Sequence, residues 1–174
     1  MELWDTGFHL PFALSYKKLL FLPDVFLCEF VIIYNMHGKS SRRKKMRVFI
    51  TDDSKLVVER LHDLLKDVSG VEVVGEAGNV PDAVSSIKRT NPDAVILDLQ
   101  MPGGSGLDVL KAIRQGHPRL KVLICTNYPY PQYKDECMAA GANYFLDKSA
   151  DFDKIPTIFR RLIKGASKRP HAAH

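Results

Sequence analysis

Two kinds of hydrophobic pattern alternate along the chain from Met46 onward. Short apolar runs rich in β-branched residues are followed by longer segments in which apolar residues recur every three or four positions. The short runs are typical of buried strands, and the longer segments are typical of amphipathic helices. The pattern predicts strands over 47–51, 71–77, 94–97, 121–126 and 144–146, and helices over 57–68, 80–90, 106–114, 131–140 and 152–164.

Local signals support the boundaries of the first two helices. Ser54 is placed to cap the first helix, because its side-chain oxygen can accept a hydrogen bond from a free backbone N–H. Gly70 is expected to end that helix. Pro81 fits the first turn of the second helix, where the missing N–H of proline has no consequence.

The regular alternation of strand and helix determines the fold class. Strands separated by helices form a parallel sheet with helices on both faces, joined by right-handed crossovers. We therefore predict an α/β domain built on a five-stranded parallel sheet. Ligands of such folds bind beyond the carboxyl ends of the strands, so the residues that end the strands are the candidates for function.

Polar side chains that can carry chemistry stand at four of these strand ends. Asp52 and Asp53 follow the first strand, Asp98 follows the third, Thr126 ends the fourth, and Lys148 follows the fifth. Clustered carboxylates repel one another and need a cation, and their oxygens suit Mg²⁺. A carboxylate beside Mg²⁺ and a lysine can attack phosphorus and form an acyl phosphate. Each residue alone could be a helix cap or a strand end, but their joint placement indicates a site.

The motifs around these residues resemble the receiver domain of two-component response regulators, in particular a stand-alone, chemotaxis-regulator-like receiver. Four segments carry the resemblance: the Asp52–Asp53 pair, VILDLQMPGGSG over 95–106, VLICT over 122–126 and GANYFLDK over 141–148. The resemblance implies a flavodoxin-like receiver fold with strand order 2-1-3-4-5. It assigns the receiver domain to 46–165, an N-terminal extension to 1–45 and a polar tail to 166–174.

The resemblance also implies a role for each candidate residue. Asp98 would accept the phosphoryl group, and Mg²⁺ would be held by Asp52, Asp53, Asp98 and the backbone carbonyl of Gln100. Phosphoryl-binding and switch roles would belong to Thr126, Lys148 and Phe145. Phosphorylation would draw the threonine hydroxyl inward, and the aromatic ring would follow into the vacated space. The surface of the last strand and the last two helices would change in consequence.

The sequence departs from the commonest family pattern at several of these positions. Asn127 follows the switch threonine where a small residue is frequent, so small phosphodonors are expected to have restricted access. Ser149 stands after Lys148 where the family often has proline, so the cis peptide bond often found there is not expected. Gln100 and Tyr128 occupy positions that, with Asn127, tune access to the phosphoryl group and its lifetime.

The function that follows from the resemblance is that of a stand-alone receiver, which is not an enzyme. Its phosphoryl group would come from a phosphohistidine of a sensor histidine kinase or a histidine phosphotransfer protein, and it would signal to a downstream protein effector. We expect no direct DNA binding, because about ten residues follow the last predicted helix. Two alternatives stay open: a receiver-like binding module that works without phosphorylation, and an aspartyl-phosphate-type phosphohydrolase, although the latter enzymes typically show DxD at the first strand.

Composition and charge indicate what class of protein this is and in which compartment it is expected. The chain of 174 residues is 45% hydrophobic and 26% charged, which is ordinary for a folded protein. Residues 1–45 hold seven basic and four acidic residues, against eighteen and sixteen in 46–174, so the main domain is nearly balanced and predicts no nucleic-acid footprint. None of the three cysteines stands in a CxxC spacing, which fits a reducing compartment, and we expect a cytoplasmic location.

The first 45 residues follow neither hydrophobic pattern. Their apolar stretch, Leu19–Ile33, is interrupted by one proline and two acidic residues, so it does not predict a membrane span. One interpretation is a poorly ordered extension or a start-site artefact, with the natural start at Met36 or Met46. The other is an amphipathic docking segment, joined to the domain by the basic linker 38–45.

The segment that follows the fourth strand is rich in aromatic residues. Its sequence, TNYPYPQY over 126–133, combines three tyrosines with two prolines. The rings either pack on the following helix as a rigid loop, or form a surface that recognises a partner, since tyrosine is frequent among interface anchors.

Overall fold

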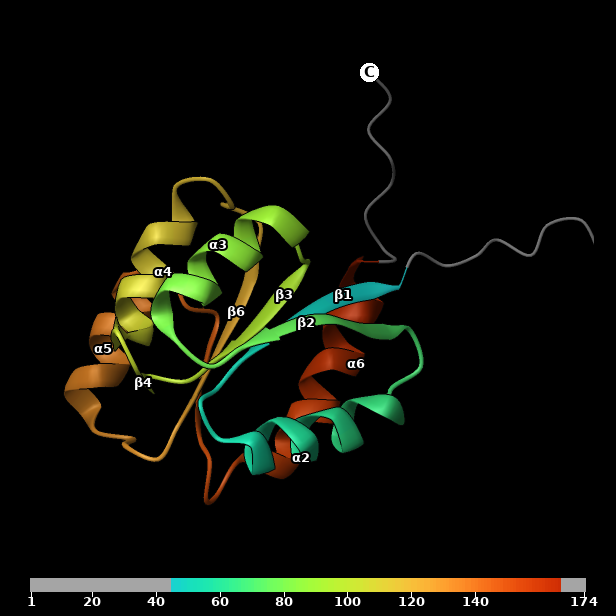
Figure 1. The fold of residues 1–174 in the computed structure, drawn as a ribbon. Coiled ribbons are helices and arrows are strands. Elements are labelled where there is room, and N and C mark those ends of the chain that lie inside the picture. The colour runs from blue at the N-terminus through green and yellow to red at the C-terminus, as the bar shows by residue number, and fades with distance from the viewer. Residues whose placement is uncertain (1–44, 167–174) are drawn as a thin grey trace, which may run out of the picture. The chain divides into compact units, whose positions relative to one another are not determined.

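The computed structural model describes residues 45–166, and its main sheet confirms the predicted fold class (Figure 1). The sheet consists of β1 (Met46–Thr51), β2 (Val71–Ala77), β3 (Ala94–Leu97), β6 (Lys121–Thr126) and β7 (Tyr144–Asp147). Neighbouring strands are parallel, in the order β2-β1-β3-β6-β7. This is the predicted order 2-1-3-4-5, counting only the strands of this sheet. The predicted N-terminal extension and all but the first residue of the predicted polar tail lie outside the described residues.

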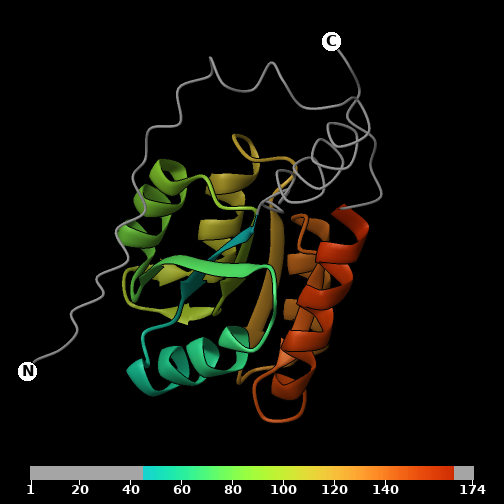
Figure 2. The ribbon, with the colours of Figure 1, turned by 90° about the vertical axis from the view of Figure 1, so that its right-hand side faces the viewer.

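Helices cover both faces of the sheet. Side chains of α2 (Lys55–Lys66) and α6 (Ile155–Ala166) pack in one core with Val48 and Ile50 of β1. The other core contains Phe49 with side chains of α3 (Val80–Thr90), α4 (Gly106–Arg114) and α5 (Pro131–Ala139). The alternation along β1 follows from the two-residue period of a strand. Figure 2 shows α3 and α6 on opposite sides of the sheet. Within residues 45–166, no helix is both long and apolar enough to cross a membrane.

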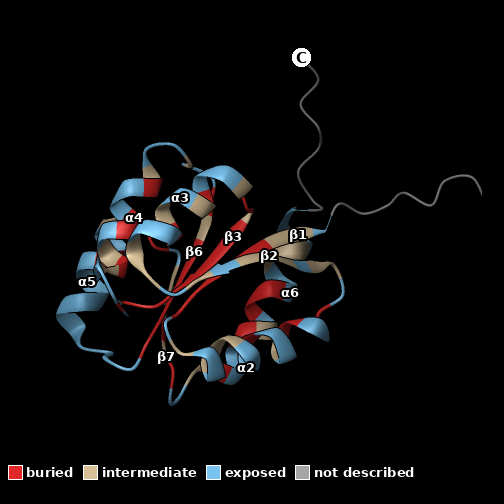
Figure 3. Ribbon diagram, viewed as in Figure 1, coloured by how far each residue is buried: buried red, intermediate tan, exposed pale blue. Residues whose placement is uncertain are grey.

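Burial is greatest in the three central strands. All four residues of β3, the last four of β1 and the last five of β6 are buried (Figure 3). The edge strand β2 contains no buried residue. A parallel sheet covered on both faces makes its central strands apolar throughout, which is why these strands could be recognised as continuous apolar runs.

Three local features differ from the predicted elements. Ser54 stands at the N-cap of α2, but its side chain makes no capping hydrogen bond, so that expectation was wrong. Its backbone N–H instead donates to Asp52 Oδ1 at 3.0 Å. The predicted last helix begins with a separate 3-10 turn, Phe152–Lys154, before α6. Finally, a short antiparallel hairpin, β4 (Gln100–Met101) and β5 (Gly104–Ser105), precedes α4 and was not predicted.

Candidate functional site

Three carboxylates meet at the carboxyl edge of the sheet. Asp52 and Asp53 follow β1 and Asp98 follows β3, which is paired with β1. One carboxylate oxygen of each lies within 4.8 Å of those of the other two. The backbone holds this arrangement, because Asp98 N donates to Thr51 O at 2.9 Å. The register of the sheet therefore brings Asp98 to Asp52 and Asp53, which lie 46 and 45 positions before it in the chain.

Lys148 joins this cluster from the end of β7. Its Nζ lies 2.6 Å from Asp52 Oδ2 and 3.0 Å from Asp98 Oδ2. The exposed fraction is only 9% for Lys148, 6% for Asp98 and 5% for Asp52. A buried ammonium or carboxylate is strongly destabilising unless it is paired. Lys148 therefore compensates the charge of two buried carboxylates, while Asp53 is exposed.

Burial and charge change the acidity of two of these groups. Burial raises the pKa of Asp98, and the charge and hydrogen bond of Lys148 offset this only in part. Burial alone would lower the pKa of Lys148, but its hydrogen bonds to the two carboxylates and their charges raise the pKa above its ordinary value. Ionisation of Asp98 is thus less favourable than that of a solvent-exposed aspartate, and an added cation would stabilise the ionised form.

The approach of α4 to Asp98 depends on Gly106. A Cβ on Gly106 would lie 2.0 Å from the backbone oxygen of Asp98, which is far inside van der Waals contact. Gly106 N donates to Leu99 O at 2.9 Å, so the first residue of α4 lies directly against the strand end. Gly106 was not predicted to have a role in the site. The run of glycines before the helix was the only signal that two backbones come this close.

Thr126 and Phe145 lie on one face of the sheet. Thr126 is fully buried at the end of β6, and its Oγ1 accepts a hydrogen bond from Tyr128 N at 3.1 Å. Phe145 is half-buried in β7 and is paired with Ile124, two residues before Thr126. Because side chains alternate along a strand, the two residues point to the face covered by α3, α4 and α5. The hydrogen bond from Tyr128 N thus ties the Thr126 hydroxyl to the loop that follows β6.

The three residues predicted to tune access to the phosphoryl group differ in whether they line the space beside the carboxylates. Gln100 and Tyr128 line a cavity of about 600 Å³ that Asp53 also lines. Asn127 is exposed and does not line that cavity. The backbone of Gln100 acts to lower the pKa of Asp98, against the larger effect of burial. Contact between the Gln100 carbonyl and a metal ion stays a prediction.

A hydrogen-bonded turn follows Lys148 and was missed in the sequence. Ser149 donates to Asp147 Oδ1 from its backbone N at 2.7 Å and from its hydroxyl at 2.6 Å. Asp147 N in turn donates to Asp151 Oδ2 at 3.2 Å. Hydrogen bonds from Ser149 lower the pKa of Asp147. The run of Asp and Ser residues was the available signal, because such side chains close turns on their own backbone.

The donor set of the cluster fits a small hard cation. All its anionic groups are carboxylates, whose oxygens are the ligands that Mg²⁺ prefers. Asp52 and Asp98 are buried, while the exposed Asp53 leaves the cluster open to solvent on one side. The arrangement can thus place a cation and a buried, partly compensated carboxylate side by side.

Comparisons with known proteins agree on one family. A family model described as the response regulator receiver domain matches residues 48–160. YvfU of Bacillus subtilis, named as a transcriptional regulatory protein, is 32% identical over 120 residues, which are 69% of this chain and 60% of YvfU. The signal receiver domain of NarL from Mycobacterium tuberculosis is 31% identical with a TM-score of 0.62, covering 72% of this chain and 99% of that one.

A second solved structure contains BeF₃ and magnesium. It is the complex of CheX and CheY with BeF₃ and magnesium from Borrelia burgdorferi, 25% identical with a TM-score of 0.58, covering 66% of this chain and 89% of that one. The chain spans about half to three-fifths of the length of the first curated relatives it matches. Because YvfU is named as a transcriptional regulator, the expectation that this protein does not bind DNA stays a prediction.

Proposed function

Because the chain belongs to the family of response-regulator receiver domains, we propose that Asp98 accepts a phosphoryl group from a phosphohistidine. The donor would be a sensor histidine kinase or a histidine phosphotransfer protein. One observation supports this role most strongly: Asp98 is buried beside two further carboxylates, with Lys148 Nζ 3.0 Å from its Oδ2. A carboxylate placed this way is a nucleophile next to a fixed positive charge.

The proposed transfer uses the side chains placed at this edge together with Mg²⁺. A carboxylate oxygen of Asp98 forms a bond to phosphorus while the bond from phosphorus to the histidine nitrogen breaks. The electron pair of that bond leaves with the imidazole, which takes a proton from solvent. Lys148 stays between Asp52 and Asp98 and compensates charge on the phosphoryl oxygens. The product is an acyl phosphate on Asp98, and the domain acts as a phosphoacceptor rather than as an enzyme.

We assign Mg²⁺ to the three-carboxylate cluster as the required cation. It would be held by Asp52, Asp53, Asp98 and the backbone carbonyl of Gln100. Bound there, Mg²⁺ would supply positive charge for the phosphoryl oxygens. The support is the oxygen-only donor set within 4.8 Å and, by relationship, the magnesium in the CheX–CheY complex.

The output would be a change in protein–protein contacts. The Thr126 hydroxyl would leave Tyr128 N and bond to the phosphoryl group, and the space it vacates lies on the face to which Phe145 points. The ring would follow the hydroxyl and change the surface of β7 and its flanking helices. A downstream protein effector would then bind one of the two states more tightly.

Intact-mass spectrometry tests the proposed transfer. The protein is incubated with Mg²⁺ and either acetyl phosphate or a histidine-phosphorylated transfer protein, because Asn127 is expected to restrict the small donor. The expected result is one added phosphoryl group that depends on Mg²⁺ and is lost in Asp98→Asn. The matched control Asp135→Asn removes an exposed carboxylate from α5 and should be phosphorylated normally. Failure with both donors in folded protein would contradict the proposal and leave a phosphorylation-independent binding module.

A further inference from the structure

The helix α5 buries little of its own surface. Of its nine residues only Cys137 is buried, and the other eight are exposed. The other α-helices that cover the sheet each bury at least two side chains. A helix on a sheet normally presents an apolar stripe to the core, so α5 offers most of its side chains to solvent or to a partner.

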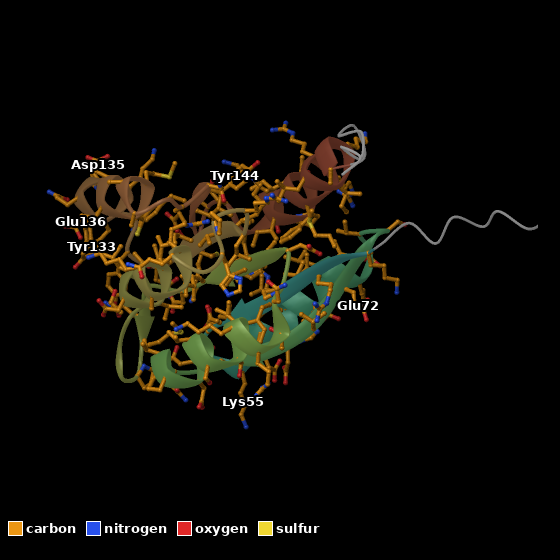
Figure 4. All side chains as sticks on the ribbon, turned by 90° about the horizontal axis from the view of Figure 1, so that it is seen from above. Lys55, Glu72, Tyr133, Asp135, Glu136 and Tyr144 are labelled. Carbon is orange, nitrogen blue, oxygen red and sulfur yellow. The ribbon has the colours of Figure 1, made fainter. Side chains whose placement is uncertain are left out.

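One side of α5 forms a wall of the cavity beside the carboxylates. Tyr133, Glu136 and Cys137 all line it, as expected for positions i, i+3 and i+4 on one helix face. Figure 4 shows Asp135, by contrast, on another side of this helix. Leu99, which follows β3, and Met101 of β4 form a buried apolar part of the cavity. Its volume of about 600 Å³ is in the range of pockets that hold small ligands or long side chains.

Tyrosine rings stand around this cavity and remain exposed. Tyr128 and Tyr133 both line it, with exposed fractions of 39% and 45%. Tyr130 connects them, because its ring centroid lies 6.4 Å from that of Tyr128 and 6.0 Å from that of Tyr133. The rings contact one another in tilted pairs at the surface. This arrangement favours the recognition surface over a loop whose rings are covered by the following helix.

The charged groups of the cavity are two carboxylates. Asp53 and Glu136 line it, both are exposed, and neither makes an ion pair within 4.0 Å among the described residues. Within residues 45–166, no lysine or arginine lines it. The cavity therefore combines aromatic faces, which attract cations, with uncompensated negative charge.

We propose that this cavity binds the arginine side chain of a partner protein. A guanidinium group is planar, stacks on aromatic rings and pairs with carboxylates, so it matches the tyrosines and the two acids together. The methylene stem of arginine would lie against the apolar part formed by Leu99 and Met101. The occupant is assigned by this charge complementarity. The site lies on the side of α5 that carries Glu136 and goes beyond the phosphoacceptor function, since it needs neither Mg²⁺ nor a phosphoryl group.

A nuclear magnetic resonance titration of the full chain without Mg²⁺ tests this proposal. The probe is the peptide acetyl-Gly-Arg-Gly-amide, and its control contains citrulline, which has the shape of arginine without the charge. We expect saturable shifts of the backbone amides of 99–107 and 128–137 with the arginine peptide. The citrulline peptide should bind roughly fivefold more weakly, as expected when a partly exposed cation loses its aromatic and carboxylate partners. Equal binding of both peptides, or shifts that do not saturate, would overturn the proposal.

Two pairs of matched variants locate the binding. Glu136→Gln should weaken arginine binding about threefold to fivefold, whereas Asp135→Asn removes the same charge from the same helix and should have little effect. Tyr133→Leu should weaken binding more than Tyr130→Leu, because Tyr130 does not line the cavity. Equal losses within either pair would indicate unspecific attraction and contradict the assigned site. Asp98→Asn should bind the peptide normally, so failure of this proposal and failure of the phosphoacceptor proposal can be told apart.

Discussion

The apolar core around the sheet and the carboxyl edge of the sheet have opposite effects on the stability of the fold. In the interior, Val48, Ile50 and Phe159 pack in one core, and every buried atom replaces contact with water by contact with protein. At the edge, Asp52 and Asp98 are buried as well, and burial raises the pKa of Asp98. The interior stabilises the fold, whereas the edge holds groups that cost stability. Such a difference is typical of a site that is shaped for function rather than for folding.

The largest loss of stability should follow from damage to the interior. Phe159 of α6 is fully buried, so Phe159→Ala removes a ring and leaves a cavity. We expect the free energy of unfolding to fall by about 3–5 kcal/mol. Cys137→Ala in α5 removes a single buried sulfur and should cost about 1 kcal/mol. Urea denaturation of both variants measures this difference. Equal losses would show that α5 and α6 contribute alike to the core.

A smaller loss should follow when the positive charge is removed from the edge. Lys148→Met leaves Asp52 and Asp98 buried without the ammonium that bonds to both. We expect the free energy of unfolding to fall by about 2–3 kcal/mol near neutral pH, because uncompensated buried charge is destabilising. The loss should shrink in acid, where the carboxylates take up protons. Denaturation at several pH values tests this, and a loss that does not change with pH would contradict the electrostatic cause.

Addition of a cation should stabilise the edge without touching the interior. At ten times its dissociation constant, Mg²⁺ should stabilise the wild-type protein by about 1.4 kcal/mol, because it binds the folded state only. Thermal unfolding with Mg²⁺ and with EDTA measures the effect. Asp53→Asn should lose most of it, whereas Asp135→Asn should retain it. The same shift in both variants would place the ion elsewhere.

The smallest effect should be a gain of stability on removal of one carboxylate. Asp98→Asn should raise the free energy of unfolding by about 1 kcal/mol at neutral pH, because it removes a buried charge and Lys148 keeps Asp52 as its partner. The folded-state pKa of Asp98 lies above the ordinary value of 3.8, so the folded protein binds the proton more tightly than the unfolded chain. The stability that Asp98 contributes to the wild-type protein is therefore lost as pH rises from 3.8 through the folded-state pKa of Asp98. The advantage of the variant should disappear below pH 3.8, and an advantage that persists in acid would have another cause.

Most of the sheet could be predicted from the sequence, and so could the position of the charged residues at its edge. These residues are Asp52, Asp53, Asp98 and Lys148. The central strands were recognisable because burial on both faces makes them apolar throughout, as in Val95 and Ile96 of β3. The parallel order then placed every strand end at one edge. Asp98 and Lys148 lie at that edge by topology, and the structure adds that Lys148 Nζ lies 3.0 Å from Asp98 Oδ2.

Other features depend on contacts that no local pattern expresses. The hairpin of β4 and β5 has strands of two residues, which are too short for a period to appear. Ser54 was expected to cap α2 with its hydroxyl, but the buried Asp52 turns back and accepts its N–H instead. The need for Gly106 arises only when α4 is docked on Asp98 O. The cavity likewise exists because α5 brings Tyr133 and Glu136 beside residues of the loop after β3.

Chemical trapping of the acyl phosphate tests the phosphoacceptor assignment most directly. The protein is phosphorylated by a histidine-phosphorylated donor in the presence of Mg²⁺, reduced with borohydride, digested and sequenced by mass spectrometry. Hydride converts an aspartyl phosphate to homoserine and leaves free aspartate unchanged. We predict homoserine at position 98 and aspartate at positions 52 and 53. Homoserine at another position, or none in protein that has gained a phosphoryl group, would contradict the role assigned to Asp98.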